Sequence, residues 1–472
     1  PPPPPPPSFN DTATPEIYTL YSSSAASDVY KRQGPSPGTD DQPRLPDRVV
    51  GEAAVTIRRA ANYTHAANIK QVMSMWKTRA LRACGFMLLA MAPVIAPRAG
   101  EIQVPSAPDN PAAVLPPFEG HYGVGVRSYY WVDETRSKSG LDGDDGQRGI
   151  SVTAWYPAVV ERDERPALYA PGTDKILAAV DDVPEKRKRF IMAHEPLLNV
   201  AANAVPAAQA VAKKDGWPVI LFSPGGNVSL HFQTALAERL ASRGFVFIAM
   251  SHPYSSLDVS PDSGFTMSLE WDLDNEDRQV ADENDNRLAG VLADDAAFVL
   301  ARLRDLPTDD EALGPVMDLE QVGIAGHSRG GKTVGRACST NPDYRACAVL
   351  DNIGPARERM TGIDQPFLTL RSAWDDARVA ELHDYLGRTG SVAHDVVLEN
   401  SNHFSCTDIP LFVAEVRLDG VDPASGIESC ASILEAFFAT FLTNKNAVAT
   451  NWLPTGEVAN VMIRRFQARA GD

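Results

Sequence analysis

The chain has 472 residues, with 44 Lys or Arg against 61 Asp or Glu, and a formal net charge of −17. An acidic surface of this kind argues against binding to nucleic acid or to an anionic membrane surface. Hydrophobic residues make up 44% of the chain, which is enough to bury a large core.

The first 72 residues do not read like a folded domain. Residues 1–33 combine a proline run with text that has no amphipathic period, and they resemble translated sequencing-adapter sequence. A natural disordered terminus is the alternative. The first methionine is Met73, so residues 34–72 are expected to be translated upstream sequence. Residues 1–72 are therefore predicted to be a non-native or disordered leader.

Residues 73–99 have the order of a secretory signal peptide. A short basic segment precedes the apolar run 83–96, and small residues follow up to Gly100. The apolar run is too short to span a bilayer. We therefore expect a secreted or periplasmic protein, with no stable membrane span, whose mature part is a single domain over residues 100–472.

The mature part is predicted to begin with an antiparallel pair of strands. Residues 124–133 and 149–156 alternate between apolar and polar positions, and the Gly/Asp-rich residues 140–146 form the hairpin loop. Residues 158–216 hold a charged run and alanine-rich helical pieces. We interpret them as an insertion at the rim of the fold.

From Pro218 onward, strands and helices alternate. The run 219–222 is continuously apolar, as expected for a strand buried on both faces. Further strands are predicted at 245–250, 322–325, 347–350, 367–370 and 395–399. The predicted helices have an amphipathic pattern: 230–242, 288–303, 379–386 and 427–443. The polar residues 252–284 are predicted to be a long rim loop. The pattern indicates an α/β fold with a mostly parallel central sheet, helices on both faces and an antiparallel N-terminal edge.

One motif carries chemistry. Gly326, Ser328 and Gly330 form G-x-S-x-G between a predicted strand and a helix, which is the nucleophile elbow of α/β-hydrolases. The serine sits on a tight turn where a side chain at either glycine would collide with the neighbouring backbone. The motif predicts that Ser328 is the nucleophile of a serine hydrolase.

A serine nucleophile needs a base, and the base needs a carboxylate. His403 follows the strand at 395–399 and comes last in the chain order of this fold, whereas His394 precedes that strand. Two positions compete for the acid, because Asp351 and Asp375 both follow strands whose carboxyl ends share one edge of the sheet.

Two backbone N–H groups are needed to stabilise the oxyanion. The glycine-rich loop after the strand at 219–222 is expected to supply the N–H of Gly226, and Arg329 follows the nucleophile and supplies the second. No metal or organic cofactor is expected. The acidic run 272–285 lacks the spacing of a calcium loop and is interpreted as solvated.

Five segments together resemble the platelet-activating-factor acetylhydrolase family of α/β-hydrolases: GVRSYYWVD with AWYPA, VILFSPGG, GIAGHSRGG, AVLDNIGP and NHFSCTDIP. The resemblance implies that the triad acid follows the strand after the nucleophile's helix, which favours Asp351. It also matches His403, Phe404 and Asp408 to a family motif. Pro224 and Arg329 depart from the family pattern, where a histidine and a bulky apolar residue are usual.

The arrangement of His403 and Cys406 also resembles secreted bacterial polyester hydrolases, in which the acid would be Asp375. The sequence therefore predicts a secreted serine hydrolase that acts on small-molecule or lipid esters through an acyl-enzyme. A cutinase-like polyester hydrolase and a catalytically silent binding protein of the same fold are the alternatives. The oligomeric state is left open.

Four of the five cysteines lie beyond the predicted signal peptide, which contains Cys84. An even number in an exported chain favours disulfides. Pairing of neighbours gives Cys338–Cys347 and Cys406–Cys430, each between the ends of a predicted helix and strand or loop. Free thiols and cross-pairings are the alternatives.

Overall fold

A mixed β-sheet is the centre of the structure, a computed structural model that describes residues 100–140, 146–261, 264–267, 277–306, 313–443 and 461–466. The predicted leader 1–72 and signal peptide 73–99 lie outside the described residues. The described residues all fall within one compact unit.

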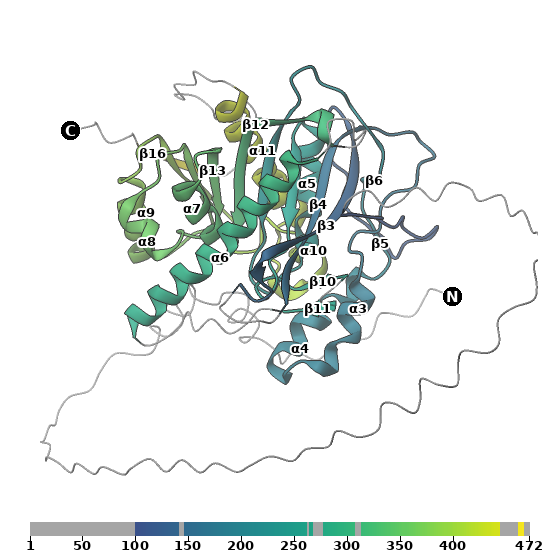
Figure 1. Cartoon of the computed structure of the whole chain (residues 1–472), viewed down its shortest axis with the longest axis horizontal. Helices are drawn as coiled ribbons and strands as arrows, with labels where there is room; N and C mark the ends of the chain where they lie inside the picture. Colours follow the sequence, from purple (N-terminus) through teal and green to yellow (C-terminus); the bar gives the residue numbers. More distant parts are fainter. Residues whose placement is uncertain are drawn as a thin grey trace, which may run out of the picture. The chain divides into compact units, whose positions relative to one another are not determined.

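The main sheet has the strand order β1-β3-β4-β9-β8-β12-β13-β14-β15-β16 (Figure 1). Its strands are β1 (Glu101–Ile102), β3 (Gly123–Ser137), β4 (Gln147–Val159), β9 (Val246–Met250), β8 (Trp217–Ser223), β12 (Met317–His327), β13 (Tyr344–Leu350), β14 (Phe367–Arg371), β15 (Ala393–Leu398) and β16 (Val461–Phe466). Short strands outside this path are β2 (Ala113–Val114), β5 (Val200–Ala201), β6 (Val205–Pro206), β7 (Gln209–Ala210), β10 (Asp258–Ser260) and β11 (Gly264–Thr266).

The strand directions confirm the predicted fold class. The strands from β9 to β15 pair in parallel, whereas β1, β3 and β4 form an antiparallel N-terminal edge. The structure adds an antiparallel strand, β16, at the opposite edge against β15. Because the parallel strands all point the same way, their carboxyl ends meet along one edge of the sheet.

Helices cover both faces of the sheet. They are α3 (Thr173–Ala178), α4 (Glu185–Met192), α5 (Thr234–Ser242), α6 (Arg278–Arg304), α7 (Gly330–Thr340), α8 (Ala356–Thr361), α9 (Asp376–Leu386), α10 (Ile409–Phe412) and α11 (Pro423–Thr443). Neighbouring residues of β8 point to opposite faces of the sheet. Ile220 packs in the core that contains α5 and α11, whereas Leu221 packs in the core that contains α6, α7 and α9. This explains why β8 reads as a continuous apolar run.

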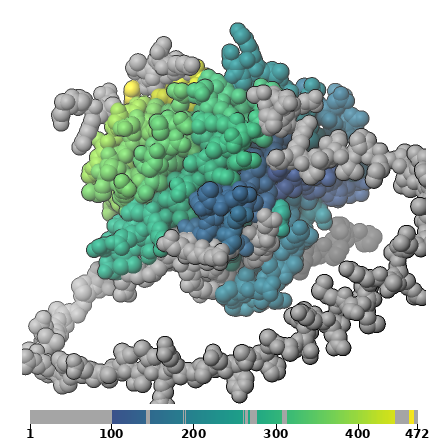
Figure 2. Space-filling view, viewed as in Figure 1, coloured from purple at the N-terminus to yellow at the C-terminus, as the bar shows by residue number. Residues whose placement is uncertain are grey.

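Helix α6 lies against β3 and β4 (Figures 1 and 2). Within the described part of the chain, α11 is the one helix long and apolar enough to cross a membrane. Its buried residues, among them Leu434 and Phe437, belong to the core shared with α5, which is typical of a core helix in a globular protein.

The predicted insertion at 158–216 differs from expectation in its secondary structure. Its charged run forms α4, but the alanine-rich residues 200–210 form the short strands β5, β6 and β7 instead of helices. Strands β6 and β7 pair with β3 and β4 and so extend the main sheet. Pro206 has no N–H for a helix, and Asn199 and Ala207 have positive φ values that break helical geometry.

The prediction of a rim loop over residues 252–284 is wrong at its C-terminal end. Helix α6 begins at Arg278, about ten residues earlier than its apolar pattern predicts. The Asp277 side chain caps the helix by accepting from the Gln279 N–H, and Arg278 pairs with Asp282 one turn later. These local interactions hold a helical turn that has no strong apolar face.

Both predicted disulfides are confirmed. Cys338 of α7 is bonded to Cys347 of β13, and Cys406 is bonded to Cys430 of α11. The second bond joins the loop that carries His403 to a core helix.

Candidate active site

The nucleophile elbow joins β12 to α7. Ser328 lies on this turn with a φ of 54°, a left-handed conformation that non-glycine residues rarely adopt. A side chain at Gly326 would overlap the Gly330 carbonyl, and one at Gly330 would overlap the Ser223 carbonyl. The two glycines are therefore required by the close approach of β12, α7 and β8. The turn leaves Ser328 partly exposed at the carboxyl edge of the sheet.

Three predicted site residues meet at this edge. His403 Nε2 lies 3.0 Å from Ser328 Oγ, and His403 Nδ1 lies 2.6 Å from Asp351 Oδ2. These are hydrogen-bond distances, with the serine on one side of the imidazole and the carboxylate on the other. The arrangement can transfer a proton from the serine hydroxyl to the imidazole while the carboxylate fixes the ring.

The Asp351 carboxylate is held by more than the histidine. Its Oδ1 accepts from the Ser372 N–H and Oγ, both at 2.8 Å, and from Trp374 Nε1 at 3.0 Å. Burial alone would raise the pKa of Asp351, but the hydrogen bond and charge of His403 outweigh it and hold the pKa well below its usual range. Asp351 is therefore a carboxylate with both oxygens occupied.

The competing residues lie elsewhere. The Asp375 carboxylate accepts from the Arg378 N–H at 2.8 Å and so caps α9, which is the ordinary role of an aspartate at a helix start. His394 lies within β15 and not at its end. The structure thus brings Asp351, and not Asp375, against His403.

The glycine-rich loop after β8 lies beside the nucleophile. A Cβ built on Gly225 would be 3.5 Å from the Ser328 Cβ. A Cβ on Gly226 would overlap the Arg329 guanidinium, so this side chain lies directly against the loop. Among the described residues the Gly226 N–H has no hydrogen-bond acceptor. The Gly226 N–H is therefore available in the loop that lies beside Ser328.

Two residues near the triad have roles that the sequence did not specify. His327 Nε2 donates to the His403 carbonyl at 2.6 Å. Burial, together with the nearby His403, lowers the pKa of His327 to about 3, so His327 is neutral and its Nε2 proton is available to donate. Trp374 holds Asp351 and stacks against Arg378, with the guanidinium 3.7 Å from the ring centroid. No pattern in the sequence around Trp374 predicts its hydrogen bond to Asp351.

Known proteins resemble the chain in sequence. The family model described as platelet-activating factor acetylhydrolase, isoform II, matches residues 109–261. The platelet-activating factor acetylhydrolase of Bos taurus is 29% identical over 263 residues, or 50% of this chain and 54% of that protein. The enzyme of the same name from Cavia porcellus is 28% identical over 165 residues, or 31% of this chain and 38% of that protein. The chain thus spans about half or less of the length of these relatives.

The chain resembles the platelet-activating factor acetylhydrolase family over residues 109–261 and over the segments that these two relatives match. This confirms the resemblance seen in the sequence. The family match ends before Ser328, Asp351 and His403, so the assignment of these three residues depends on their geometry.

A solved structure supports the fold. The ferulic acid esterase of Streptomyces cinnamoneus aligns with a TM-score of 0.60 at 22% identity, covering 74% of this chain and 99% of that chain. At this identity the likeness shows the shared α/β-hydrolase fold.

In this acetylhydrolase-like chain, Asp408 joins the His403 loop to α5. Its Oδ2 accepts from the Ala235 N–H at 3.0 Å and from the Tyr169 hydroxyl at 3.2 Å. Complete burial raises the pKa of Asp408 to about 8, although these hydrogen bonds oppose the rise. The protonated form is thus favoured in the folded state.

Asp408→Asn is expected to remove a pH-dependent loss of stability. Because the folded pKa is raised, the contribution of Asp408 is fully present below about pH 4 and is lost as pH rises through about 8, at up to ~1.4 kcal/mol per pH unit. Asparagine cannot ionise but keeps an acceptor for Ala235. The melting temperature of the variant relative to the wild type should therefore rise from pH 5 to pH 8. Asp422→Asn, at the exposed start of α11, is the control. An unchanged difference across this range would contradict the prediction.

The disulfide of Cys406 is expected to support both stability and turnover. It closes a loop of 24 residues, for which chain entropy suggests on the order of 3 kcal/mol. Cys406→Ala/Cys430→Ala should lower the melting temperature and also turnover, because the loop that carries His403 is released. Cys338→Ala/Cys347→Ala is the matched control, expected to lower the melting temperature with a smaller change in turnover. Equal turnover in the two double variants would contradict the link to His403.

Proposed function

We propose that residues 100–472 form a single catalytic domain, a secreted serine hydrolase that cleaves carboxylic esters through an acyl-enzyme. The observation that carries the proposal is the hydrogen-bonded series of Ser328, His403 and Asp351 at the carboxyl edge of the sheet. This fold collects its reactive groups at that edge.

The reaction has two steps. In the first, His403 Nε2 takes the proton of Ser328 as Oγ attacks the acyl carbon. The N–H groups of Gly226 and Arg329 stabilise the oxyanion, and the N-terminus of α7 adds a favourable dipole. Collapse of the tetrahedral intermediate breaks the ester C–O bond, and His403 protonates the leaving alcohol.

In the second step, water attacks the acyl-enzyme. His403 takes a proton from this water and returns one to Ser328, which releases the carboxylic acid and restores the enzyme. Asp351 keeps the imidazole in the tautomer with Nδ1 protonated, so that Nε2 can accept. Apart from the ester and water, the residues of the chain supply every group that these steps use.

The names of the curated relatives support a small or lipid ester with a short acyl group as the substrate. Pro224 and Arg329 depart from the family pattern. Pro224 precedes Gly225 in the loop beside Ser328, and the Arg329 guanidinium lies against Gly226, so both are expected to influence which ester binds. Export is supported by the signal-like residues 73–99 and by two disulfides, which persist in oxidising compartments.

Two alternatives make different predictions. A polyester hydrolase that uses Asp375 is disfavoured because that carboxylate caps α9. A silent binding protein of the same fold would not need a serine, a histidine and an aspartate hydrogen-bonded in series.

The test uses the purified full chain. A fluorophosphonate probe should form an adduct on Ser328, located by peptide mapping, and soluble esters of graded acyl length should be hydrolysed with a preference for short acyl groups. A film of an aliphatic polyester, tested in parallel, distinguishes the cutinase-like alternative. Absence of both adduct and hydrolysis would support the silent protein and refute the proposal.

A further inference from the structure

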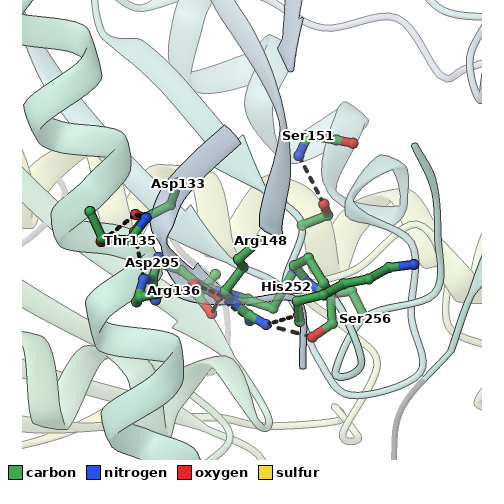
Figure 3. Close-up of polar contacts among 12 residues, drawn as sticks. Asp133, Thr135, Arg136, Arg148, Ser151, His252, Ser256 and Asp295 are labelled. Atoms are coloured by element: carbon green, nitrogen blue, oxygen red, sulfur yellow. Dashed lines mark hydrogen bonds and ion pairs between the residues drawn. The ribbon is translucent and has the colours of Figure 1, made fainter. Parts of the chain in front are cut away.

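A second group of hydrogen-bonded polar side chains lies near the site but is completely buried. Arg148 of β4 donates to both oxygens of Asp295 of α6, at 2.6 Å each (Figure 3). His252 Nδ1 lies 2.8 Å from Asp295 Oδ2, and His252 Nε2 lies 2.8 Å from Ser223 Oγ. The Ser223 hydroxyl also contacts Thr333 Oγ1 of α7 at 2.8 Å.

This group repeats the order serine, histidine, aspartate, but it cannot be a second catalytic centre. Ser223, Asp295 and Arg148 are 0% exposed and His252 is 1% exposed, so no substrate reaches them. Burying an ion pair to this degree carries a desolvation penalty, and only complete hydrogen bonding of both partners offsets it. Here both oxygens of Asp295 are occupied, and satisfied buried networks of this kind hold their parts rigidly.

The network is connected to the loop that contains Gly226. Ser223 is the last residue of β8, immediately before this loop, and His252 contacts its hydroxyl. At the other end of the loop, the Asn227 N–H donates to the Ser255 carbonyl at 2.8 Å. Both ends of the loop 223–227 are therefore held by the single segment 252–255.

The segment 252–255 is itself fixed. Arg148 Nη2 donates to the Pro253 carbonyl at 3.3 Å, and the His252 N–H donates to Ser256 Oγ at 3.1 Å (Figure 3). The Ser255 N–H donates to the His252 carbonyl at 2.9 Å. The buried Arg148–Asp295 pair thus anchors His252, and His252 anchors the loop.

We infer that His252, anchored by Asp295 and Arg148, is a positioning residue that fixes the Gly226 loop through the Ser223 hydroxyl. This inference rests on the proposed function, because it assigns the loop to oxyanion stabilisation. The network touches no reacting atom. It sets where the Gly226 N–H stands relative to Ser328.

Loosening of the Gly226 loop should affect kcat more than KM, because oxyanion stabilisation acts in the transition state. A donor to the oxyanion is used in the transition state, and a displacement of about 1 Å can cost on the order of 10²-fold. Loosening the loop should lower kcat and leave KM nearly unchanged. A trifluoromethyl ketone, which forms a tetrahedral adduct on the serine, should lose affinity by the same factor.

The main test is Ser223→Ala, which removes one buried hydroxyl. Ser251→Ala is the matched control, because Ser251 is also buried, also makes two hydrogen bonds, and contacts Ser151 and Asp258 but not the loop. We expect Ser223→Ala to lower kcat and trifluoromethyl ketone affinity about 10-fold, with KM within twofold. Ser251→Ala should keep kcat within twofold even if its melting temperature falls as much.

His252→Asn provides a second variant. Its amide can still reach Asp295 but is too short to reach Ser223, so it should reproduce the loss of kcat. The double variant with Ser223→Ala should be no slower than Ser223→Ala alone, since both substitutions remove the contact between Ser223 and His252. If His252→Asn does not fold, the comparison of Ser223→Ala with Ser251→Ala still tests the inference.

The inference is overturned if Ser223→Ala keeps kcat and inhibitor affinity within twofold of the wild type, or if its loss only follows the unfolded fraction. A wild type that neither labels at Ser328 nor hydrolyses esters would refute the proposed function, and this inference with it. A reactive wild type with an unaffected Ser223→Ala variant refutes this inference alone.

Discussion

Replacing Ser328 with alanine is expected to lower ester turnover by roughly 10³-fold or more while the fold is kept. The hydroxyl is the attacking group, and among the described residues no other serine lies at hydrogen-bond distance from His403. Alanine has nearly the same size and meets the same positive φ, so the elbow should accept it. Residual activity would come from the remaining oxyanion donors acting on water.

Turnover is measured on a short-chain ester, with melting temperature and fluorophosphonate labelling recorded for each variant. Ser339→Ala, on the exposed side of α7, is the control for a serine lost from the same helix. It should keep wild-type turnover and labelling. Activity of Ser328→Ala above about 10% of the wild type, in material free of contaminating esterases, would refute the nucleophile assignment.

The sequence predicted the main sheet because strands buried on both faces leave a strong pattern. Runs such as 219–222 and 322–325 are continuously apolar, since alternate residues enter cores on opposite faces. The same reasoning located the site, because a residue that directly follows a parallel strand must lie at the carboxyl edge. Ser328 and Asp351 directly follow β12 and β13, and His403 follows β15 after a short loop.

The sequence did not predict the contacts that hold Asp351. Trp374 and Ser372 follow a different strand from Asp351, and only the register of β13 against β14 brings them together. The buried pair of Arg148 and Asp295 was also missed. Charged residues usually lie at the surface, and these two are 147 positions apart in sequence.

Local pattern was also misleading where a partner element decided the outcome. The alanine-rich residues 200–210 have high helix propensity, yet they form β5, which pairs with β2, and β6 and β7, which pair with β3 and β4, because propensity is weaker than tertiary context. The first turns of α6 lack an apolar stripe, and they are held instead by a side-chain cap and a charge pair, so the apolar pattern predicts only the later part, 288–303.

Asp351→Asn is expected to lower turnover by up to about 10⁴-fold, and the contacts of Asp351 explain why. Three donors, from Ser372 and Trp374, point at Oδ1. An asparagine must therefore place its carbonyl oxygen at that position. Its NH₂ group then replaces Oδ2 and faces His403 Nδ1, which lies 2.6 Å away in the wild type.

An NH₂ group donates, so His403 Nδ1 must then accept, and the imidazole proton moves to Nε2. A protonated Nε2 cannot take the proton of Ser328, so the base is lost although the geometry is nearly unchanged. Asp375→Asn is the matched control. Asparagine caps a helix about as well as aspartate, so this variant should keep its stability and turnover.

The pair of variants is compared by kcat on one short-chain ester, with melting temperatures to show that both are folded. A large loss in Asp351→Asn with near wild-type Asp375→Asn supports the triad of Ser328, His403 and Asp351. The reverse result, with turnover lost only in Asp375→Asn, would assign the acid to the strand after β13 and favour the polyester-hydrolase alternative. In that case the carboxylate that caps α9 would have to leave the helix and reach His403 during the reaction.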